Sequence, residues 1–452
     1  MITQEKSQEN KRVNKKVLWI LIMCMLVLSA FAGGYYVNRI TQSKNVKIIW
    51  EVSDIVDKVG YVYDPVSGEY IEFDGEKVAQ IIADNFLDEY SHYYTKEEYE
   101  EELKRSAGQM SGFGISYDRT ENKVFKIIGN SPAEAAGMKK GDVITAYKEN
   151  GEEEFTALAD GQAVAEYLGG VSSNKTVTLK INNGDEREVS IKKSDYIATY
   201  VSYYDSEYKI TLGYDNKKIV LNKTDRNADE YPELNGQTDV AYIKLDAFNG
   251  DADKQFAKIM DYAKTTGLRK SLVLDLRGNG GGQMDILTEI ASYLLDVDKP
   301  VKVAYAKEKN RTTHFEISEV NFNDNIQKIS VIADKNTASA SECLLGAMLY
   351  HYDLANSEVF GYGRLVIVGE PESASTYGKG IMQTTYVLES GGALKLTTAR
   401  VLWPNLAEEI CIHGIGIKPD REANAVSDAD ALTRAIQTLG ESALKIQTDG
   451  DE

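Results

Sequence analysis

From Thr238 onward, the pattern of apolar and polar positions predicts strands and helices in alternation. The apolar run VAYIKL precedes helical spacing from Ala252 to Thr265, and SLVLDL precedes the helical stretch MDILTEIASYLL. A third apolar run, ISVIAD, leads directly into TASASECLLGAM, and after VIVGE the segments TTYVLE and ALKLTT flank a Ser-Gly-Gly turn. This alternation predicts an α/β layer with a largely parallel sheet, followed by a hairpin.

The first half of the chain has a different pattern. Residues 45–104 have mostly helical spacing and end in TKEEYEEELKR, whose charges are typical of a solvated helix face. Between Ser106 and Ser194, short alternating runs such as KVFKIIG and TVTLKI predict strands. A helix is expected to start at Ser131, and a second helix is expected near Ala157 to Leu168. Residues 195–236 are rich in tyrosine and match neither pattern.

The N-terminus predicts membrane insertion. No charged residue occurs from Val17 through Asn38, which is enough apolar length to cross a bilayer. The basic residues before this run favour a cytoplasmic N-terminus and an extracytoplasmic remainder; they are Lys6, Lys11, Arg12, Lys15 and Lys16. A retained anchor is the preferred interpretation because the run exceeds an ordinary signal sequence. The alternative is signal-peptidase cleavage at Ala30-Phe31-Ala32.

Charge and cysteine content exclude some classes of protein. The net charge is −19, and without the five basic and two acidic groups of residues 1–16 it becomes −22. A nucleic-acid partner is therefore not expected, because nothing concentrates cations into a phosphate-binding face. Cys24 lies in the apolar N-terminal run, and Cys343 and Cys411 are interpreted as small buried residues rather than a disulfide framework.

The segment TASASE, Thr337 to Glu342, contains a candidate nucleophile. A serine at a strand–turn–helix junction is fixed and exposed, and the free N–H groups of the helix start can stabilise an oxyanion. The alternative is that Ser339 or Ser341 simply caps the helix. Four histidines occur in the chain, and only His413 is a candidate base. His92 belongs to the helical N-terminal part and His314 to a polar loop segment. His351 lies too far along the same helix to reach Ser339.

Lysine is the other candidate base. Lys379 lies between two glycines at the start of the strand IMQTTYVL, so its backbone can pack closely against a neighbour. An amine accepts a proton only where burial lowers its pKa, and the alternative is an exposed loop lysine. Gln383, four residues later on the same strand face, is placed to orient the amine.

The glycine cluster in LDLRGNGGG, Leu274 to Gly282, follows a buried strand. The Lys-Ser/Thr of a P-loop is missing, and Gln283 stands where a dinucleotide fingerprint needs glycine or alanine. Bare N–H groups at this loop would serve equally well as an oxyanion hole. No cofactor or metal is expected.

Together these motifs resemble the carboxyl-terminal processing peptidases, the tail-specific serine proteases of bacteria and plastids. The resemblance implies that Ser339 is the nucleophile, Lys379 the base, Gln383 its support, and that Ala340 and Gly281 supply oxyanion N–H groups. It runs from Val52 to Asp420, over LDEYSHYYTKEEYEEEL, GFGISY, SPAEAAGMKKGDVI, YIKLDAFNG, LVLDLRGNGGG, TASASECLLGAM, VIVGEPESASTYGKGIMQ and GGALKLTTARVLWP.

The resemblance also implies a domain organisation, with a ClpP/crotonase-like α/β protease core and an inserted PDZ domain. In the PDZ domain, Gly112, Phe113, Gly114 and Ile115 can bend so that their N–H groups receive a peptide carboxylate while the peptide adds as a strand. The expected parts are a basic tail (1–16), an anchor (17–38), a helical region (39–105), the PDZ domain (106–195), the protease core (196–440) and an acidic tail (441–452).

The expected function is a membrane-anchored serine endopeptidase that cleaves exported proteins through an acyl-enzyme and recognises free C-termini. A homo-oligomer is left open. The rival hypotheses are a catalytically silent PDZ scaffold and a Ser-His esterase using His413. Two segments depart from the family: HYDLANSEVFGYG looks inserted after the nucleophile helix, and GEPESASTYGKG is long. Either could shift the dyad or add a lid, although Asp275, Arg277 and Asn279 are kept.

Overall fold

The computed structural model describes residues 44–59, 74–118, 120–159, 161–266, 270–354, 365–369, 373–403, 412–418, 425 and 427–440. They belong to two compact units, the first ending at Ile81 and the second starting at Ile82. Helices α2 (Lys44–Val59) and α3 (Gly75–Phe86) agree with the helical prediction for this region. Within the described ranges, no helix is both long and apolar enough to cross a membrane. The predicted anchor at residues 17–38 and the tails at 1–16 and 441–452 lie outside those ranges.

A short strand interrupts the region predicted to be helical. Strand β1 (His92–Tyr94) pairs antiparallel with β20 (Ala393–Leu402) and thereby joins a sheet ordered β1-β20-β15-β16, with β19 also on β20. Helix α4 (Lys96–Ser106) follows, and Thr95 and Glu98 form a capping box at its start. The helical prediction was wrong at β1 because its partner lies far away in the sequence. The remaining strands of this sheet are β15 (Lys302–Glu308), β16 (Thr312–Glu316) and β19 (Ile381–Val387).

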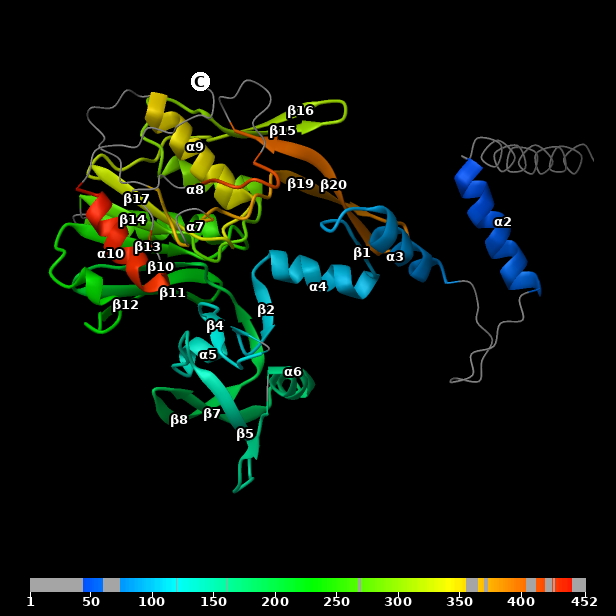
Figure 1. Cartoon of the computed structure of the whole chain (residues 1–452), viewed down its shortest axis with the longest axis horizontal. Coiled ribbons are helices and arrows are strands. Elements are labelled where there is room, and N and C mark those ends of the chain that lie inside the picture. The colour runs from blue at the N-terminus through cyan, green and yellow to red at the C-terminus, as the bar shows by residue number, and fades with distance from the viewer. Residues whose placement is uncertain are drawn as a thin grey trace, which may run out of the picture. The chain divides into compact units, whose positions relative to one another are not determined.

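Residues 109–197 form a small β-rich domain with its own apolar core, seen in the lower part of Figure 1. Its largest sheet is ordered β6-β5-β7-β8. Ser131 caps helix α5 as predicted, whereas α6 starts at Gly161 rather than Ala157, because Thr156–Ala157 form strand β6. The elements are β2 (Gln109–Gly112), β3 (Ile115–Tyr117), β4 (Val124–Ile127), α5 (Pro132–Ala135), β5 (Val143–Glu149), β6 (Thr156–Ala157), α6 (Gly161–Gly170), β7 (Thr176–Asn183), β8 (Asp185–Lys192) and β9 (Ser194–Ile197).

A seven-stranded sheet organises the rest of the second unit, in the order β12-β11-β10-β13-β14-β17-β18. The pairings from β13 to β18 are parallel, as the alternation of strands and helices predicts. The pairings from β12 to β13 are antiparallel and involve the tyrosine-rich strands β10, β11 and β12, for which the sequence predicted no pairing. The strands are β10 (Val201–Tyr204), β11 (Tyr208–Asp215), β12 (Lys218–Asp225), β13 (Val240–Leu245), β14 (Ser271–Asp275), β17 (Lys328–Ala333) and β18 (Leu365–Ile367).

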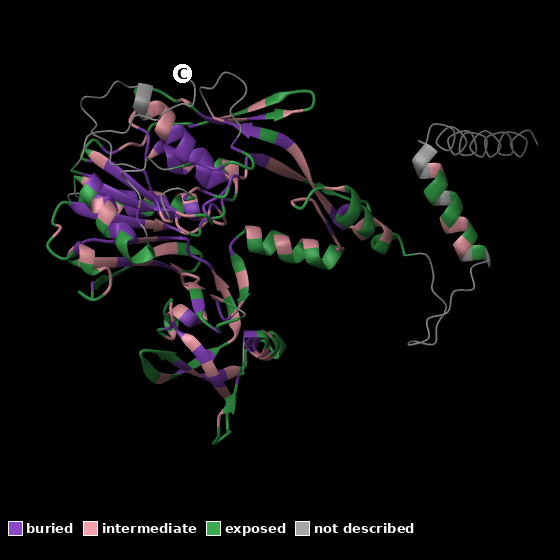
Figure 2. Ribbon diagram, in the orientation of Figure 1, coloured by how far each residue is buried: buried purple, intermediate pink, exposed green. Residues whose placement is uncertain are grey.

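Both faces of this sheet are buried, and successive residues of its strands serve different cores. Ile243 and Leu274 pack in the core that includes residues of α7, α8 and α9, whereas Tyr242 and Val273 pack in the core that includes α10. Figure 2 shows the centre of the unit as buried. This two-sided burial explains why the strands read as continuous apolar runs. The helices are α7 (Ala252–Thr265), η1 (Pro232–Leu234), α8 (Met284–Ser292), α9 (Ala340–Leu354) and α10 (Asp428–Thr438).

The parallel register brings three chain segments to one edge of the sheet. Strands β13, β14 and β17 run in the same direction, so the residues after their carboxyl ends meet there. The glycine cluster follows β14 directly, and the TASASE segment follows β17. In open α/β sheets, sites form at this edge.

Candidate active site

Ser339 lies in the turn between β17 and α9 and has a strained backbone. Its φ angle is 58°, in the left-handed region that residues other than glycine rarely adopt. The Ser339 N–H donates to Oε2 of Glu342 at 2.8 Å. Such strain costs about 1–3 kcal/mol and concentrates at functional positions. Within the described part of the chain, the Ser339 hydroxyl has no hydrogen bond, whereas the Ser341 hydroxyl donates to the carbonyl of Asn279 at 3.0 Å. The two serines therefore differ in role, and neither side chain caps the helix.

The glycine loop after β14 lies directly against the nucleophile turn. At Gly281, whose φ is 98°, a Cβ atom would stand 2.8 Å from the Cβ of Ser339 and from the N atom of Ala340. Only glycine fits this approach. The Ala340 N–H has no partner among the described residues, as an oxyanion donor requires. The Gly281 N–H instead donates to Oδ1 of Asn279 at 2.9 Å. The predicted oxyanion role therefore agrees with the position of Ala340, while the Gly281 donor is already engaged.

Asn279 holds the loop and the turn together. It is fully buried, and its Nδ2 donates to the carbonyl of Leu245 at 2.9 Å. Its own carbonyl accepts the N–H of Ala338 at 3.0 Å as well as the Ser341 hydroxyl. Through its side chain and its backbone carbonyl, Asn279 thus connects the end of β13, the glycine loop and the nucleophile turn.

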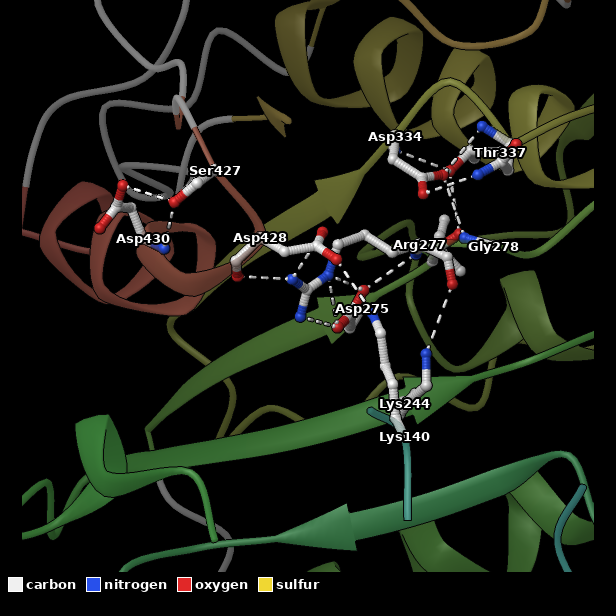
Figure 3. Close-up of polar contacts among 12 residues, drawn as sticks. Lys140, Lys244, Asp275, Arg277, Gly278, Asp334, Thr337, Ser427, Asp428 and Asp430 are labelled. Carbon is white, nitrogen blue, oxygen red and sulfur yellow. Dashed lines mark hydrogen bonds and ion pairs between the residues drawn. The ribbon is translucent and has the colours of Figure 1, made fainter. Parts of the chain in front are cut away.

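Asp275 and Arg277 form a buried ion pair at the base of the glycine loop (Figure 3). The guanidinium donates to the Asp275 carboxylate from Nε and from Nη2, the latter at 2.6 Å, and the Tyr242 hydroxyl donates to it at 2.6 Å. Burial alone would raise the pKa of Asp275, but the charges of Lys244 and Arg277 and these hydrogen bonds lower it well below its usual value. The pair fixes the start of the loop.

A second anion, Asp428, extends this ion pair to another part of the molecule. Arg277 Nη1 donates to the Asp428 carbonyl at 2.9 Å and lies 3.3 Å from its Oδ1. Lys140, in the small β-rich domain, donates to Oδ2 of Asp428 at 2.9 Å. Figure 3 shows Asp428, at the start of α10, between the two cations. The glycine loop is thereby joined to the β-rich domain through charged side chains.

Glu342 connects the nucleophile to the candidate base, although the sequence marked it only as the acid that opens an apolar stretch. Its side chain is fully buried. One oxygen, Oε2, accepts the N–H groups of Ser339 at 2.8 Å and Lys379 at 2.9 Å. The other oxygen accepts the N–H of Gly378 at 2.7 Å and the hydroxyl of Thr376. A carboxyl three residues after the serine is the signal that was available, but its partners become visible only in the fold.

The flanking glycine allows the close packing that the sequence predicts for Lys379. Gly378 has a φ of 88°, and a Cβ atom there would stand 2.8 Å from the N atom of Gly416. The Lys379 amine lies 5.0 Å from the ring centroid of Tyr90 and has no hydrogen bond or ion pair within the described part of the chain. Burial and the charge of Lys395 lower the pKa of Lys379, while Asp88 and Glu342 act in the opposite direction. Together these effects place the pKa of Lys379 below its ordinary value.

Gln383 and His413 have no contact with the candidate dyad atoms in the described residues. Gln383 Nε2 donates to Oγ1 of Thr397 at 3.0 Å, so its orienting role at Lys379 stays a prediction. His413 is exposed, and its ring meets the edge of Tyr90 at 6.2 Å between centroids. Strand β1 contains His92, α9 contains His351, and His314 lies in β16 rather than in a loop. Among the described residues, none of these histidines has a hydrogen bond to Ser339 or Lys379, and the choice of lysine as the base stays a prediction.

The predicted peptide loop bends at its two glycines, and its role in peptide binding stays a prediction. The φ angles of Gly112 and Gly114 are 150° and 81°. The N–H groups of Phe113 and Gly114 have no partner among the described residues, although the carbonyls of both residues accept hydrogen bonds, from Ala133 and Ile128. Ile115 begins β3 and pairs with Ile127. Two adjacent free N–H groups can bind an anion.

A mixed sheet that presents a strained serine, an adjoining glycine loop and a desolvated lysine defines a serine hydrolase. Residues 239–423 match the model of peptidase family S41. The chain is a serine peptidase, and its residues 239–423 are similar to this family.

Related proteins agree with this placement. The "Probable CtpA-like serine protease" of Staphylococcus haemolyticus (strain JCSC1435) is 27% identical over 92% of this chain and 75% of its own length. Its namesake from Staphylococcus aureus (strain COL) is 28% identical over 81% of this chain and 64% of its own length. A solved structure from Bacteroides fragilis NCTC 9343, described as an S41 protease, aligns with a TM-score of 0.51 at 16% identity, covering 85% of this chain and 92% of that one. The last similarity concerns the fold alone.

Proposed function

We propose that this peptidase is a membrane-anchored endopeptidase that processes the C-terminal regions of exported proteins, with Ser339 as nucleophile and Lys379 as base. The observation that carries the proposal is the shared partner Glu342, whose Oε2 accepts the backbone N–H groups of both residues. A single buried carboxyl group thereby holds the backbone of a strained serine next to the backbone of Lys379, whose amine is unpaired within the described residues and partly desolvated. An activated nucleophile requires this neighbourhood of hydroxyl and base.

The chemistry follows from the protonation state of the amine. Neutral Lys379 takes the hydroxyl proton as Ser339 Oγ attacks the scissile carbonyl carbon, and the Ala340 N–H stabilises the oxyanion that forms. The tetrahedral intermediate collapses to an acyl-enzyme, and the ammonium returns its proton to the leaving amine. Lys379 then deprotonates a water molecule, which attacks the ester and releases Ser339.

The small β-rich domain is proposed to be a PDZ domain that binds free C-terminal peptides ending in small apolar residues. The support is the pair of free N–H groups at Phe113 and Gly114, next to strand β3 and with α6 in the same domain. A terminal carboxylate would accept both N–H groups. Amidating the peptide should abolish binding to the purified full-length protein, whereas equal affinity for amidated and free peptides would refute this role.

The membrane anchor is proposed from the uncharged run Val17–Asn38 and its basic flank. We expect the mature protein to keep its N-terminus, to fractionate with membranes, and to expose its catalytic part outside the cytoplasm. N-terminal sequencing that begins immediately after Ala32 would show cleavage instead.

Proteolysis by five variants tests the dyad. Ser339→Ala and Lys379→Ala should each abolish peptide cleavage without unfolding the protein, and the double variant should be scarcely worse than either, because the pair acts as a unit. Gln383→Ala should cost less, and His413→Ala should leave substantial activity.

Lys379→Arg is the most informative substitution. Arginine keeps the charge and the length but cannot release its proton at neutral pH, so it should be as inactive as alanine. An active Lys379→Arg enzyme would reject the base role. Loss of activity in a folded His413→Ala enzyme would favour the histidine-dependent esterase-like site. A fluorophosphonate probe that fails to label Ser339, even with a PDZ-binding peptide present, would favour a silent scaffold.

A further inference from the structure

The turn that precedes strand β1 is held next to the candidate base by long-range hydrogen bonds. Pairing of β1 with β20 places His92 opposite Lys395. One residue earlier, the Ser91 hydroxyl accepts the N–H of Thr397 at 3.1 Å and donates to Asp88 at 2.7 Å. The turn at residues 88–91 is therefore fixed on the strand that pairs with β19, which follows Lys379 directly. It is part of the wall of the site rather than a loose connection.

Tyr90 projects from this turn onto Lys379. The amine lies over the Tyr90 ring, 5.0 Å from its centroid. The Tyr90 hydroxyl is 3.4 Å from the hydroxyl of Tyr377, two residues before the lysine, and the ring of His413 meets Tyr90 edge-on. The ring is thus restrained on two sides. Within the described residues, the amine has no hydrogen bond or ion pair in addition to this ring contact.

We propose that Tyr90 is a positioning residue for the reaction, whose ring covers the Lys379 amine, shields it from water and holds it at the nucleophile. This inference rests on the proposed function of Lys379 as base. The aromatic ring suits the task because it covers a large area and has few rotatable bonds. A carboxylate in the same place would instead pair with the amine and keep it protonated.

Two opposing effects decide how Tyr90 changes the protonation of the amine. A ring face attracts the ammonium form, by about 0.5–1 kcal/mol at exposed sites and about 2 when desolvated. Shielding from water favours the neutral form, by up to about 3–5 pKa units for a fully buried amine. Burial is the largest effect on Lys379 and lowers its pKa, and the Tyr90 ring, over which the amine lies, is proposed to supply part of that burial.

Three charged groups also act on the amine, and Tyr90→Ala replaces none of them. Lys395 on β20 also lowers the pKa of Lys379, whereas Asp88 in the turn and Glu342 on α9 raise it. Tyr377 and His413 touch Tyr90 rather than the amine. A change that follows removal of the ring can therefore be assigned to lost shielding.

The pH dependence of kcat/KM tests this role in the full-length protein. Tyr90→Ala should move the rising limb of the profile to higher pH by about one unit, with an approximately tenfold loss at neutral pH, because each unit changes the neutral fraction tenfold. Tyr90→Phe keeps the aromatic ring and should leave the rising limb of the kcat/KM profile at its wild-type pH. Tyr386→Ala, an exposed tyrosine on β19, is the matched control and should change neither. An unchanged limb in Tyr90→Ala, or equal impairment by Tyr90→Phe, overturns the proposal.

A direct titration separates this inference from the dyad itself. Reductive methylation with carbon-13 formaldehyde gives each lysine an NMR signal, and the Lys379 signal is identified by its loss in Lys379→Arg. In a Ser339→Ala background, Tyr90→Ala should raise the titration midpoint of that signal, and an unmoved midpoint overturns the shielding role. If Lys379→Arg is active while Tyr90→Ala still raises the midpoint of the Lys379 signal, the dyad is refuted and the shielding role stands. If Tyr90→Ala does not fold, Tyr90→Leu provides the same comparison.

Discussion

Arg277 and Lys379 are two partly buried cations at opposite ends of the same site, and their surroundings are opposite in kind. Arg277 is 16% exposed, binds the fully buried Asp275 with Nε and Nη2, and also meets Asp428. The amine of Lys379 has an aromatic ring and, within the described chain, no hydrogen bond or ion pair. Burial acts to lower the pKa of both, but Asp275 reverses the effect and raises that of Arg277, whereas that of Lys379 stays lowered.

This difference in surroundings distinguishes Arg277, which stabilises the fold, from Lys379, which we propose is placed for chemistry. A buried charge is retained at low cost only where it is paired and hydrogen-bonded, as Arg277 is. An unpaired buried amine violates this rule, and such violations are expected at functional positions. What distinguishes the candidate base is therefore the lack of an ion-pair partner within the described chain, since both residues have basic side chains and both adjoin glycine-rich segments.

The largest effect is expected from Lys379→Met, which removes the amine but keeps an apolar side chain of similar length. We expect a loss of roughly 10²–10⁴-fold in kcat/KM, the usual contribution of a general base. Stability should rise at neutral pH. The unfolded lysine binds a proton that the folded one resists, so the wild type loses stability below the unfolded pKa of 10.5 and regains it as pH rises.

Thermal denaturation across pH measures this second effect. The melting temperatures of wild type and Lys379→Met should differ most near neutral pH and converge towards pH 10.5, the ordinary lysine value. A Lys379→Met protein that is less stable than wild type at neutral pH would show that Lys379 is a structural cation after all.

Arg277→Met should lower the stability of the protein, whereas Lys379→Met should raise it at neutral pH. The substitution leaves Asp275, which is fully buried, without its cation, and breaking a buried pair costs about 3–5 kcal/mol. Activity should fall together with stability, because the glycine loop loses its support. Replacing both partners, in Asp275→Asn with Arg277→Met, should recover part of the lost stability. Urea denaturation of the wild type and of these two variants measures the differences.

The matched control is Arg311→Met. Arg311 also pairs with a glutamate, Glu308, but its side chain is 75% exposed. Removal of such a pair should cost less than about 1 kcal/mol. Equal losses for Arg277→Met and Arg311→Met would mean that burial does not distinguish the two ion pairs.

Local patterns were enough to predict the elements that carry the dyad. Helix α7 has the predicted bounds, Ala252–Thr265, because its apolar spacing is regular. The serine was expected where a strand runs into a helix, and α9 starts one residue after Ser339. Lys379 was identified by its two glycines, one of which, Gly378, has the positive φ that makes glycine necessary. In each case the signal lies within a few residues of the feature.

The features that were missed all depend on contacts between distant segments. Strand β1 is too short to be recognised by periodicity and forms because β20 offers it an edge. The antiparallel half of the large sheet is formed by tyrosine-rich strands whose pairing is not encoded by a regular alternation. Glu342 and Tyr90 looked like ordinary helix and turn residues, since their partners at Lys379 come from another part of the chain.

A smaller effect is expected from the charges around the amine. Lys395 lowers the pKa of Lys379, so Lys395→Gln should raise it and move the rising limb of kcat/KM to higher pH. Asp88 acts in the opposite direction, and Asp88→Asn should move the limb to lower pH. The two variants are controls for each other, because both remove one charge. Shifts in the same direction, measured in low salt, would contradict this electrostatic arrangement.

The smallest effect is expected at the outer end of the Arg277 cluster, where Lys140 meets Asp428. Their side chains are 67% and 54% exposed, so Lys140→Gln should cost at most about 1 kcal/mol, and high salt should remove the difference. Asp428→Asn should cost more, because Asp428 also contacts Arg277 and lies in the first turn of α10, where a negative charge is favoured. A double-mutant cycle of Lys140→Gln with Asp428→Asn isolates the pair. A coupling above about 2 kcal/mol would mean that the β-rich domain is held to the catalytic core by this contact, as firmly as the buried pair holds the glycine loop.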